Sequence, residues 1–158
     1  MTIKNYTTNI NPMKTIGEIE ILLANYGAKA IMKEFNGDSS VKAVNFMVGI
    51  NEQDIPFKIP FELNAWVALI NQVVDEGKLA ERFRDDSNKA RAVGWRVIKD
   101  WIDAQLALVS TKSVKIQQVF LPYAIVNIEG QTLYEKIESK GFGNLQLIEG
   151  KDEGEMIK

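Results

Sequence analysis

The chain has 158 residues, of which 46% are hydrophobic and 25% are charged, so it can form one compact core. It contains neither cysteine nor histidine. This composition excludes disulfides, zinc sites built from Cys or His, and nucleophiles that histidine activates. No apolar run reaches the roughly 18 residues of a membrane-spanning helix. We therefore expect a non-catalytic, cytoplasmic protein with no membrane contact, no metal and no cofactor.

The first third of the chain predicts a helix followed by strands. Thr15 with Glu18 matches a capping box, which places the helix start at residue 16, and Gly27 is placed to end the helix. The Asn36-Gly37 dipeptide predicts a two-residue hairpin turn between strands at 30–35 and 41–50. In the second of these strands, Lys42 should share one side with Val44, Phe46 and Val48.

A third strand is predicted at 54–62, where apolar residues alternate with other residues. Pro56 and Pro60 lie on the opposite face of this strand and cannot donate hydrogen bonds to a ladder. They predict an edge strand that is protected from further pairing. The three strands should form an antiparallel meander that packs on a helix later in the chain.

The remainder of the chain predicts helices. Asn64 can cap a helix that Gly77 ends, and residues 78–87 should form a loop or a short helix. A long helix should then cover residues 88–109, a short helix should end near Pro122, and a last helix should end at Gly141. The sequence therefore predicts one α+β domain over residues 1–148, with an acidic, flexible tail over residues 149–158.

The long helix is apolar around more than half of its circumference. Steps of 100° per residue place Trp101 in the middle of the apolar arc, as a core residue, and Trp95 at its edge. Gly94 should permit the close approach of another backbone. In a domain this small, part of the arc is left for a contact between subunits, which predicts a homodimer or a higher assembly.

All four arginines of the chain lie between residues 82 and 96. The segment from Lys78 to Lys99 carries seven cations and three acidic residues, whereas the whole chain has a net charge of −2. Arginine is the preferred planar donor to phosphate, and an aromatic ring beside it offers a platform for a base. The candidate nucleic-acid-binding residues are therefore Arg82, Arg84, Lys89, Arg91, Trp95 and Arg96.

The same cations have possible acidic partners nearby in the sequence. Arg96 has Asp100 four residues on, a spacing that favours an ion pair on a helix surface, and Arg82 and Arg84 lie beside Asp85 and Asp86. The sequence does not decide between one basic surface and separately neutralised arginines. Glu18 with Glu20, and Glu138 with Lys140, lack the arrangement that a metal-dependent nuclease requires.

Several stretches resemble a small family of proteins encoded by phages and prophages, a family without an assigned activity. These stretches are "YTT", "TIGEIEILLANYGAKAIMKEF", "VGWRVIKDWIDAQLALV", "VFLPY" and "GQTLYEKI", which together cover most of the chain. The resemblance implies an accessory protein that acts in the cytoplasm of the bacterial host. It implies no catalytic residue.

Three functions remain open at this point. The first is the binding of single-stranded nucleic acid, with little sequence preference, through the arginine cluster. The second is the inhibition of a host enzyme or defence complex by binding to it as a protein partner. The third is a sponge for a nucleotide ligand. The clustering of the arginines favours nucleic acid, and a continuous positive groove in the folded chain is the feature that separates the first function from the second.

Overall fold

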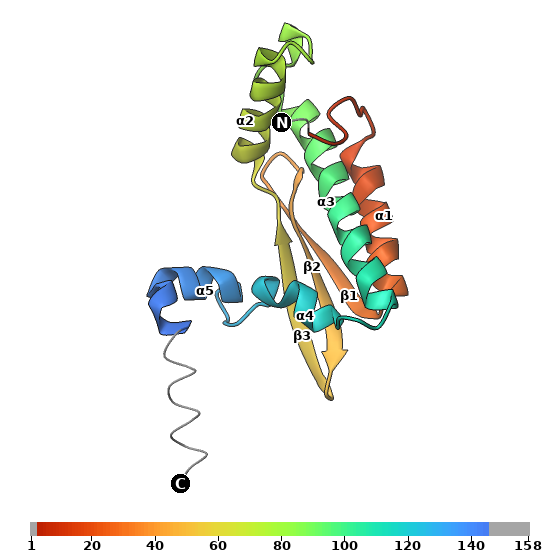
Figure 1. Cartoon of the computed structure of the whole chain (residues 1–158), viewed down its shortest axis with the longest axis vertical. Helices are drawn as coiled ribbons and strands as arrows, with labels where there is room; N and C mark the ends of the chain where they lie inside the picture. Colours follow the sequence, from red (N-terminus) through yellow and green to blue (C-terminus); the bar gives the residue numbers. More distant parts are fainter. Residues whose placement is uncertain (1–2, 146–158) are drawn as a thin grey trace.

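The protein is an antiparallel sheet with helices packed on one face, as a computed structural model that describes residues 3–145 shows (Figure 1). The predicted α+β class is confirmed. In chain order the elements are α1 (Pro12–Asn25), β1 (Ala28–Phe35), β2 (Val41–Ile50), β3 (Gln53–Pro60), α2 (Leu63–Asp75), the 3₁₀ turn η1 (Glu81–Phe83), α3 (Ser87–Ser110), α4 (Ile116–Phe120), the 3₁₀ turn η2 (Leu121–Tyr123), α5 (Leu133–Lys140) and η3 (Phe142–Leu145).

Two helices begin before the residues that the sequence predicts. Helix α1 begins at Pro12, because the Asn11 side chain accepts the Met13 N–H and so caps the helix at 2.8 Å. Thr15 lies inside this helix and is fully buried. Helix α2 begins at Leu63 with Glu62 at the N-cap position, so the prediction that Asn64 caps it is wrong. The predicted ends are confirmed, since Gly77 and Gly141 follow their helices with positive φ angles.

The two hairpin turns also differ from the prediction. The connection between β1 and β2 covers residues 36–40, because the Asp38 carboxylate accepts the Ser40 N–H and the Asn36 N–H donates to Ser40 O at 2.8 Å. The predicted two-residue turn at Asn36-Gly37 is therefore wrong. The two-residue turn joins β2 to β3 instead, at Asn51 and Glu52, whose φ angles of 50° and 65° match a type I′ turn.

The three strands form a meander in the order β1-β2-β3, as predicted. Phe46 of β2 lies opposite both Ile31 of β1 and Phe57 of β3, on the face that the helices cover. Lys42 is exposed and does not share the buried side of its strand, because it is an extra, unpaired residue of β2 between the pairs Glu34–Ala43 and Phe35–Val41. Strand β3 lies at the edge, where Ile125 N–H donates to Pro56 O at 2.8 Å in a short bridge.

The main core lies between this sheet and helices α1, α3 and α4. Phe120 of α4 packs edge-on against Phe46, at 5.4 Å between ring centroids, and Phe57 stacks on Phe46 at 5.2 Å. The expected packing of the meander on the long helix is confirmed. A smaller cluster lies between α2, η1 and the first half of α3, and Leu63 and Trp66 border both clusters.

Helix α3 is surrounded in its first half and half-open in its second. Helix α1 runs beside it in the same direction, while α2 covers only its first turns (Figure 1). As a result Trp95 is 1% exposed and stacks on Phe61, whereas Trp101 is only partly buried. The predicted roles of the two tryptophans are thus reversed. Gly94 does permit a close approach, but by the rings of Phe61 and Trp66 and not by a backbone.

No helix within residues 3–145 has the length and apolarity needed to cross a membrane. The predicted acidic tail at residues 149–158 lies outside the described residues, as does the end of the predicted domain beyond residue 145.

Candidate functional site

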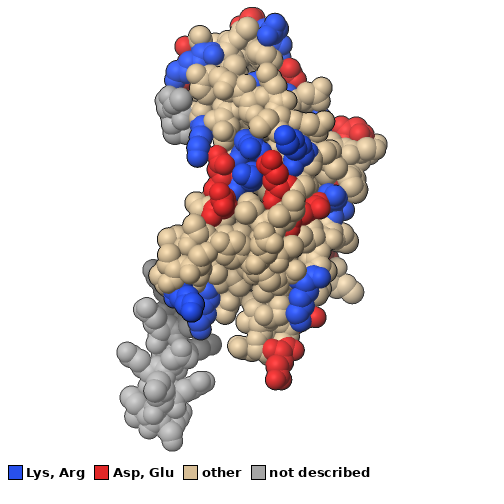
Figure 2. Space-filling view, turned by 90° about the vertical axis from the view of Figure 1, so that its right-hand side faces the viewer, with Lys and Arg blue, Asp and Glu red and all other residues tan. Residues whose placement is uncertain are grey.

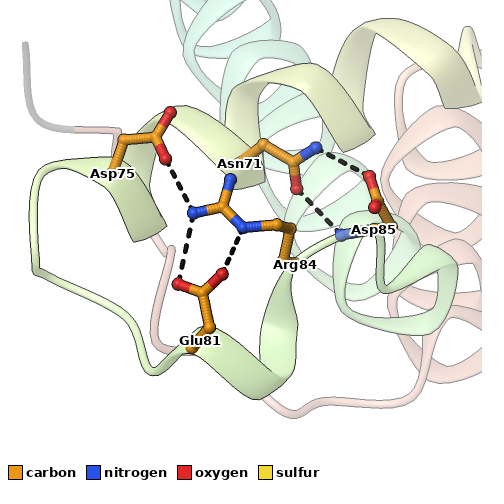
Figure 3. Close-up of polar contacts among 5 residues, drawn as sticks. All are labelled: Asn71, Asp75, Glu81, Arg84 and Asp85. Carbon is orange, nitrogen blue, oxygen red and sulfur yellow. Dashed lines mark hydrogen bonds and ion pairs between the residues drawn. The ribbon is translucent and has the colours of Figure 1, made fainter.

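The arginine cluster does not form one surface, and Arg84 illustrates why. Its guanidinium lies between the end of α2 and η1, where Nη2 donates to Asp75 Oδ1 at 2.7 Å and Nε donates to Glu81 (Figure 3). The hydrogen bonds to Glu81 and then to Asp75 raise the pKa of Arg84 above its ordinary value. Asn71 holds the neighbouring Asp85, with hydrogen bonds of 2.8 Å to its carboxylate and from its backbone N–H. Arg84 therefore closes the loop after α2.

The two arginines of α3 also contact carboxylates of other elements. Arg91 Nη2 lies 3.1 Å from Asp38 Oδ2 in the β1–β2 turn. Arg96 binds Glu18 of α1 and lies 3.4 Å from the Thr15 hydroxyl. Asp100, the expected partner of Arg96, instead accepts from Asn5 Nδ2 at 2.7 Å. Both arginines therefore fix neighbouring elements to α3, and neither has the free guanidinium that a phosphate contact requires.

Of the remaining members of the predicted site, Lys89 and Arg82 lie over the same ring, that of Phe83, at 4.9 Å and 4.8 Å from its centroid, but only Arg82 is exposed. Lys89 is 5% exposed, and its Nζ donates to Thr8 O at 2.8 Å and to Asn9 Oδ1 at 3.1 Å. Burial lowers the pKa of Lys89 below its ordinary value. Arg82 is exposed and lies 4.8 Å above the Phe83 ring, and it has no acidic partner within residues 3–145. Trp95 is buried and offers no face to a base.

The surface charge agrees with this separation. On the side of the molecule that carries α1, positive and negative side chains lie next to one another, and no continuous positive area is visible (Figure 2). The structure thus brings the six predicted residues near one helix without joining them into a groove.

A different site lies where α2 leaves α3 uncovered. A hollow of about 410 Å³ opens between α2, the end of β3, the middle of α3 and η2. Helix α2 projects from one end of the sheet, and α4 crosses the strands nearer their middle (Figure 1). We call this space the aromatic hollow, lined by Ile59, Pro60, Glu62, Trp66, Val97, Ile98, Trp101 and Tyr123.

The walls of the aromatic hollow are held in place by packing behind them. Trp66 stacks on Phe61 with 6.1 Å between ring centroids, and Phe61 in turn stacks on the buried Trp95 at 5.0 Å. On the other side, Trp101 meets Tyr123 edge-on at 5.5 Å and Phe120 at 5.6 Å. Trp66 and Trp101 each contact a core ring, and Tyr123 is held against Trp101. The hollow is therefore largely formed before any occupant arrives.

Glu62 is the only charged residue among those that line the aromatic hollow. It occupies the N-cap position of α2, but its side chain accepts no capping hydrogen bond. Its side chain is exposed, and no Lys or Arg among residues 3–145 forms an ion pair with it. The hollow therefore combines a mostly apolar surface with one carboxylate at its border.

The sequence prediction missed this site because its members come from four elements. The sequence places Trp101 in the core, and Tyr123 enters only within the stretch "VFLPY" of the resemblance. The available signal was the apolar arc of α3, which was too wide for the expected neighbours to cover. The structure places Val97, Ile98 and Trp101 of that arc in the hollow, and the arc's remaining apolar surface is what an occupant would contact.

Two further features of the described residues bear on chemistry. No three Asp or Glu side chains within residues 3–145 lie close enough together to hold a metal ion. A smaller hollow of about 280 Å³ lies on the sheet face that the helices leave open, around Met32, Met47 and Pro56. No protein-family model, curated protein or solved structure matches this chain. Its function is therefore inferred from its own geometry.

Proposed function

We propose that this chain is a non-catalytic protein that binds a partner protein, and that the aromatic hollow receives anchor side chains of that partner. The observation that carries the proposal is that the partly buried rings of Trp66, Trp101 and Tyr123 surround one preformed apolar hollow. The resemblance to phage-encoded proteins predicts a host protein as the partner.

The composition of the aromatic hollow supports a protein partner. Tryptophan and tyrosine are the residues that most often carry binding energy in protein interfaces, and they act from well-packed pockets near the interface centre. A volume of about 410 Å³ accommodates a few side chains or a small ligand. The exposed apolar residues Leu108 and Leu121, on α3 and η2, extend the apolar surface of the elements that form the hollow.

Nucleic-acid binding remains a prediction from the sequence, and the geometry adds no support to it. Single-stranded nucleic acid requires free cations along a groove together with accessible aromatic faces. In the described part of the chain, Arg84, Arg91 and Arg96 contact carboxylates, and Trp95 is enclosed in the core. The same separation of the arginines argues against a nucleotide site built from them.

A selection from a yeast-displayed library of random peptides tests the proposal. Peptides enriched on the immobilised protein should carry aromatic or large aliphatic residues and bind with micromolar affinity. Tyr123→Ala and Trp101→Ala should each weaken that binding about tenfold or more, as expected for anchor contacts. Tyr26→Ala is the matched control, because Tyr26 is an exposed tyrosine at the end of α1, outside the hollow. It should leave the affinity unchanged.

Two results would contradict the proposal. Enriched peptides that bind wild type, Tyr123→Ala and Trp101→Ala equally well would place the ligand elsewhere. Light scattering that shows a homodimer, which Trp101→Ala converts to a monomer, would assign the hollow to a second copy of this chain. That second result would instead support the sequence prediction of a homo-oligomer.

A further inference from the structure

The carboxylate at the border of the aromatic hollow indicates the chemistry of the occupant, an inference that rests on the function proposed above. Several charged side chains within residues 3–145 form ion pairs, among them Arg84 with Asp75 and Glu81, Arg91 with Asp38, and Lys58 with Glu34. Glu62 differs from these carboxylates, because within residues 3–145 no cation lies within ion-pair distance of it.

Three aromatic side chains lie around the same hollow as this carboxylate. Trp66 belongs to the first turn of α2, one turn after Glu62, and Trp101 and Tyr123 form the opposite wall. Aromatic rings attract cations through the negative potential of their faces, most strongly in tryptophan. A carboxylate beside such rings adds a direct electrostatic attraction. An anionic or purely apolar occupant leaves this attraction unused.

We propose that the aromatic hollow receives a lysine or arginine side chain of the partner protein, with its aliphatic stem against the rings and its charge beside Glu62. Long basic side chains suit such a site, because they combine an apolar stem with a charged end. The charge complementarity is local: within residues 3–145 no lysine or arginine lines the hollow, so none of these cations competes for the place.

Nuclear magnetic resonance with two small probes tests this inference on the full chain. The probes are n-butylammonium, which reproduces the end of a lysine side chain, and 1-butanol, a neutral molecule of the same chain length. Both are titrated at constant ionic strength while the indole N–H signals of the three tryptophans are followed. The signals of Trp66 and Trp101 should move, and butylammonium should bind about threefold to tenfold more tightly than butanol.

Variants of single glutamates make the test specific. Glu62→Gln should abolish the preference for butylammonium and leave butanol binding unchanged. Glu129→Gln is the matched control, since Glu129 is an exposed glutamate in the loop before α5, outside the hollow. It should keep the preference of wild type.

The outcomes separate this inference from the function on which it rests. Equal binding of both probes at Trp66 and Trp101, or an unchanged preference in Glu62→Gln, overturns the cation inference and leaves an apolar protein-binding site. Enriched peptides that bind in the hollow without a basic residue overturn it in the same way. Failure of peptides and probes alike to move these signals overturns the proposed function as well.

Discussion

Replacing Gly94 with alanine tests how tightly the packing around α3 is fixed. In an exposed helix, alanine is more stable than glycine by about 1 kcal/mol. At Gly94, however, the added Cβ would lie 2.6 Å and 2.8 Å from two Phe61 ring carbons and 2.8 Å from Trp66 Cδ2. Ordinary contacts between carbon atoms are about 3.5–4.0 Å, so at least one ring must move by roughly 1 Å.

The Phe61 ring has little room for that movement, because it is stacked between Trp66 and Trp95. Overpacking of a core commonly costs about 1–3 kcal/mol, from which the helix propensity gain of alanine is subtracted. We therefore expect Gly94→Ala to lower the free energy of unfolding by up to about 2 kcal/mol. Urea denaturation followed by far-ultraviolet circular dichroism measures this change.

Gly17→Ala provides the control for this substitution. Gly17 lies in the middle of α1, and a Cβ there would meet nothing within 4 Å. Gly17→Ala should therefore stabilise the protein by up to about 1 kcal/mol. If Gly94→Ala also stabilises the protein, the close packing of Phe61 and Trp66 on α3 is refuted, and with it the rigidity of one wall of the aromatic hollow.

Three further predictions follow from the contacts of α3. Trp95→Ala should destabilise the fold by about 3–5 kcal/mol in urea denaturation, and Trp101→Ala by less than about 2 kcal/mol because that ring is only partly buried. Equal losses of unfolding free energy would contradict the assignment of Trp95 to the core and of Trp101 to a partly buried position. Burial lowers the pKa of Lys89 in the folded chain below the 10.5 of the unfolded chain, so between these two pKa values the unfolded chain binds more protons. The free energy of unfolding of wild type should therefore rise with pH in that window. Urea denaturation between pH 7 and 10.5 measures this rise, which Lys89→Met should lack. Fluorescence anisotropy with labelled single-stranded oligonucleotides at low salt should show no saturable binding at tens of micromolar protein. If binding is seen and Arg84→Ala weakens it, Arg84 is available to phosphate despite its carboxylate partners.

The elements of this fold were largely predictable because their signals are local. The start and end of α3 were placed within one residue, since the apolar period and the polar segment before it are both explicit in the sequence. Errors arose where a second local signal competed with the one chosen. At the start of α1, Asn11 and Pro12 form a stronger cap than Thr15, and in the first hairpin Asp38 favours a longer turn.

The functional site could not be predicted in the same way, because it depends on which neighbours cover α3. A helical wheel shows that Trp95 and Trp101 are both on or near the apolar arc. It does not show that α2 packs only against the first half of α3. The pairing of Arg91 with Asp38 and of Arg96 with Glu18 joins residues about fifty to eighty positions apart. Local charge counting therefore predicted a basic surface that long-range ion pairs neutralise.

The most direct test of the account is the response of the three tryptophan indole signals to an enriched peptide. A ¹H–¹⁵N spectrum of the labelled protein resolves one indole N–H for each tryptophan, and the three residues differ in exposure: Trp95 is buried, while Trp66 and Trp101 line the aromatic hollow. Peptide addition should shift the Trp66 and Trp101 signals and leave the Trp95 signal nearly unchanged. A peptide that binds without moving either hollow signal would contradict the claim that the aromatic hollow is the binding site.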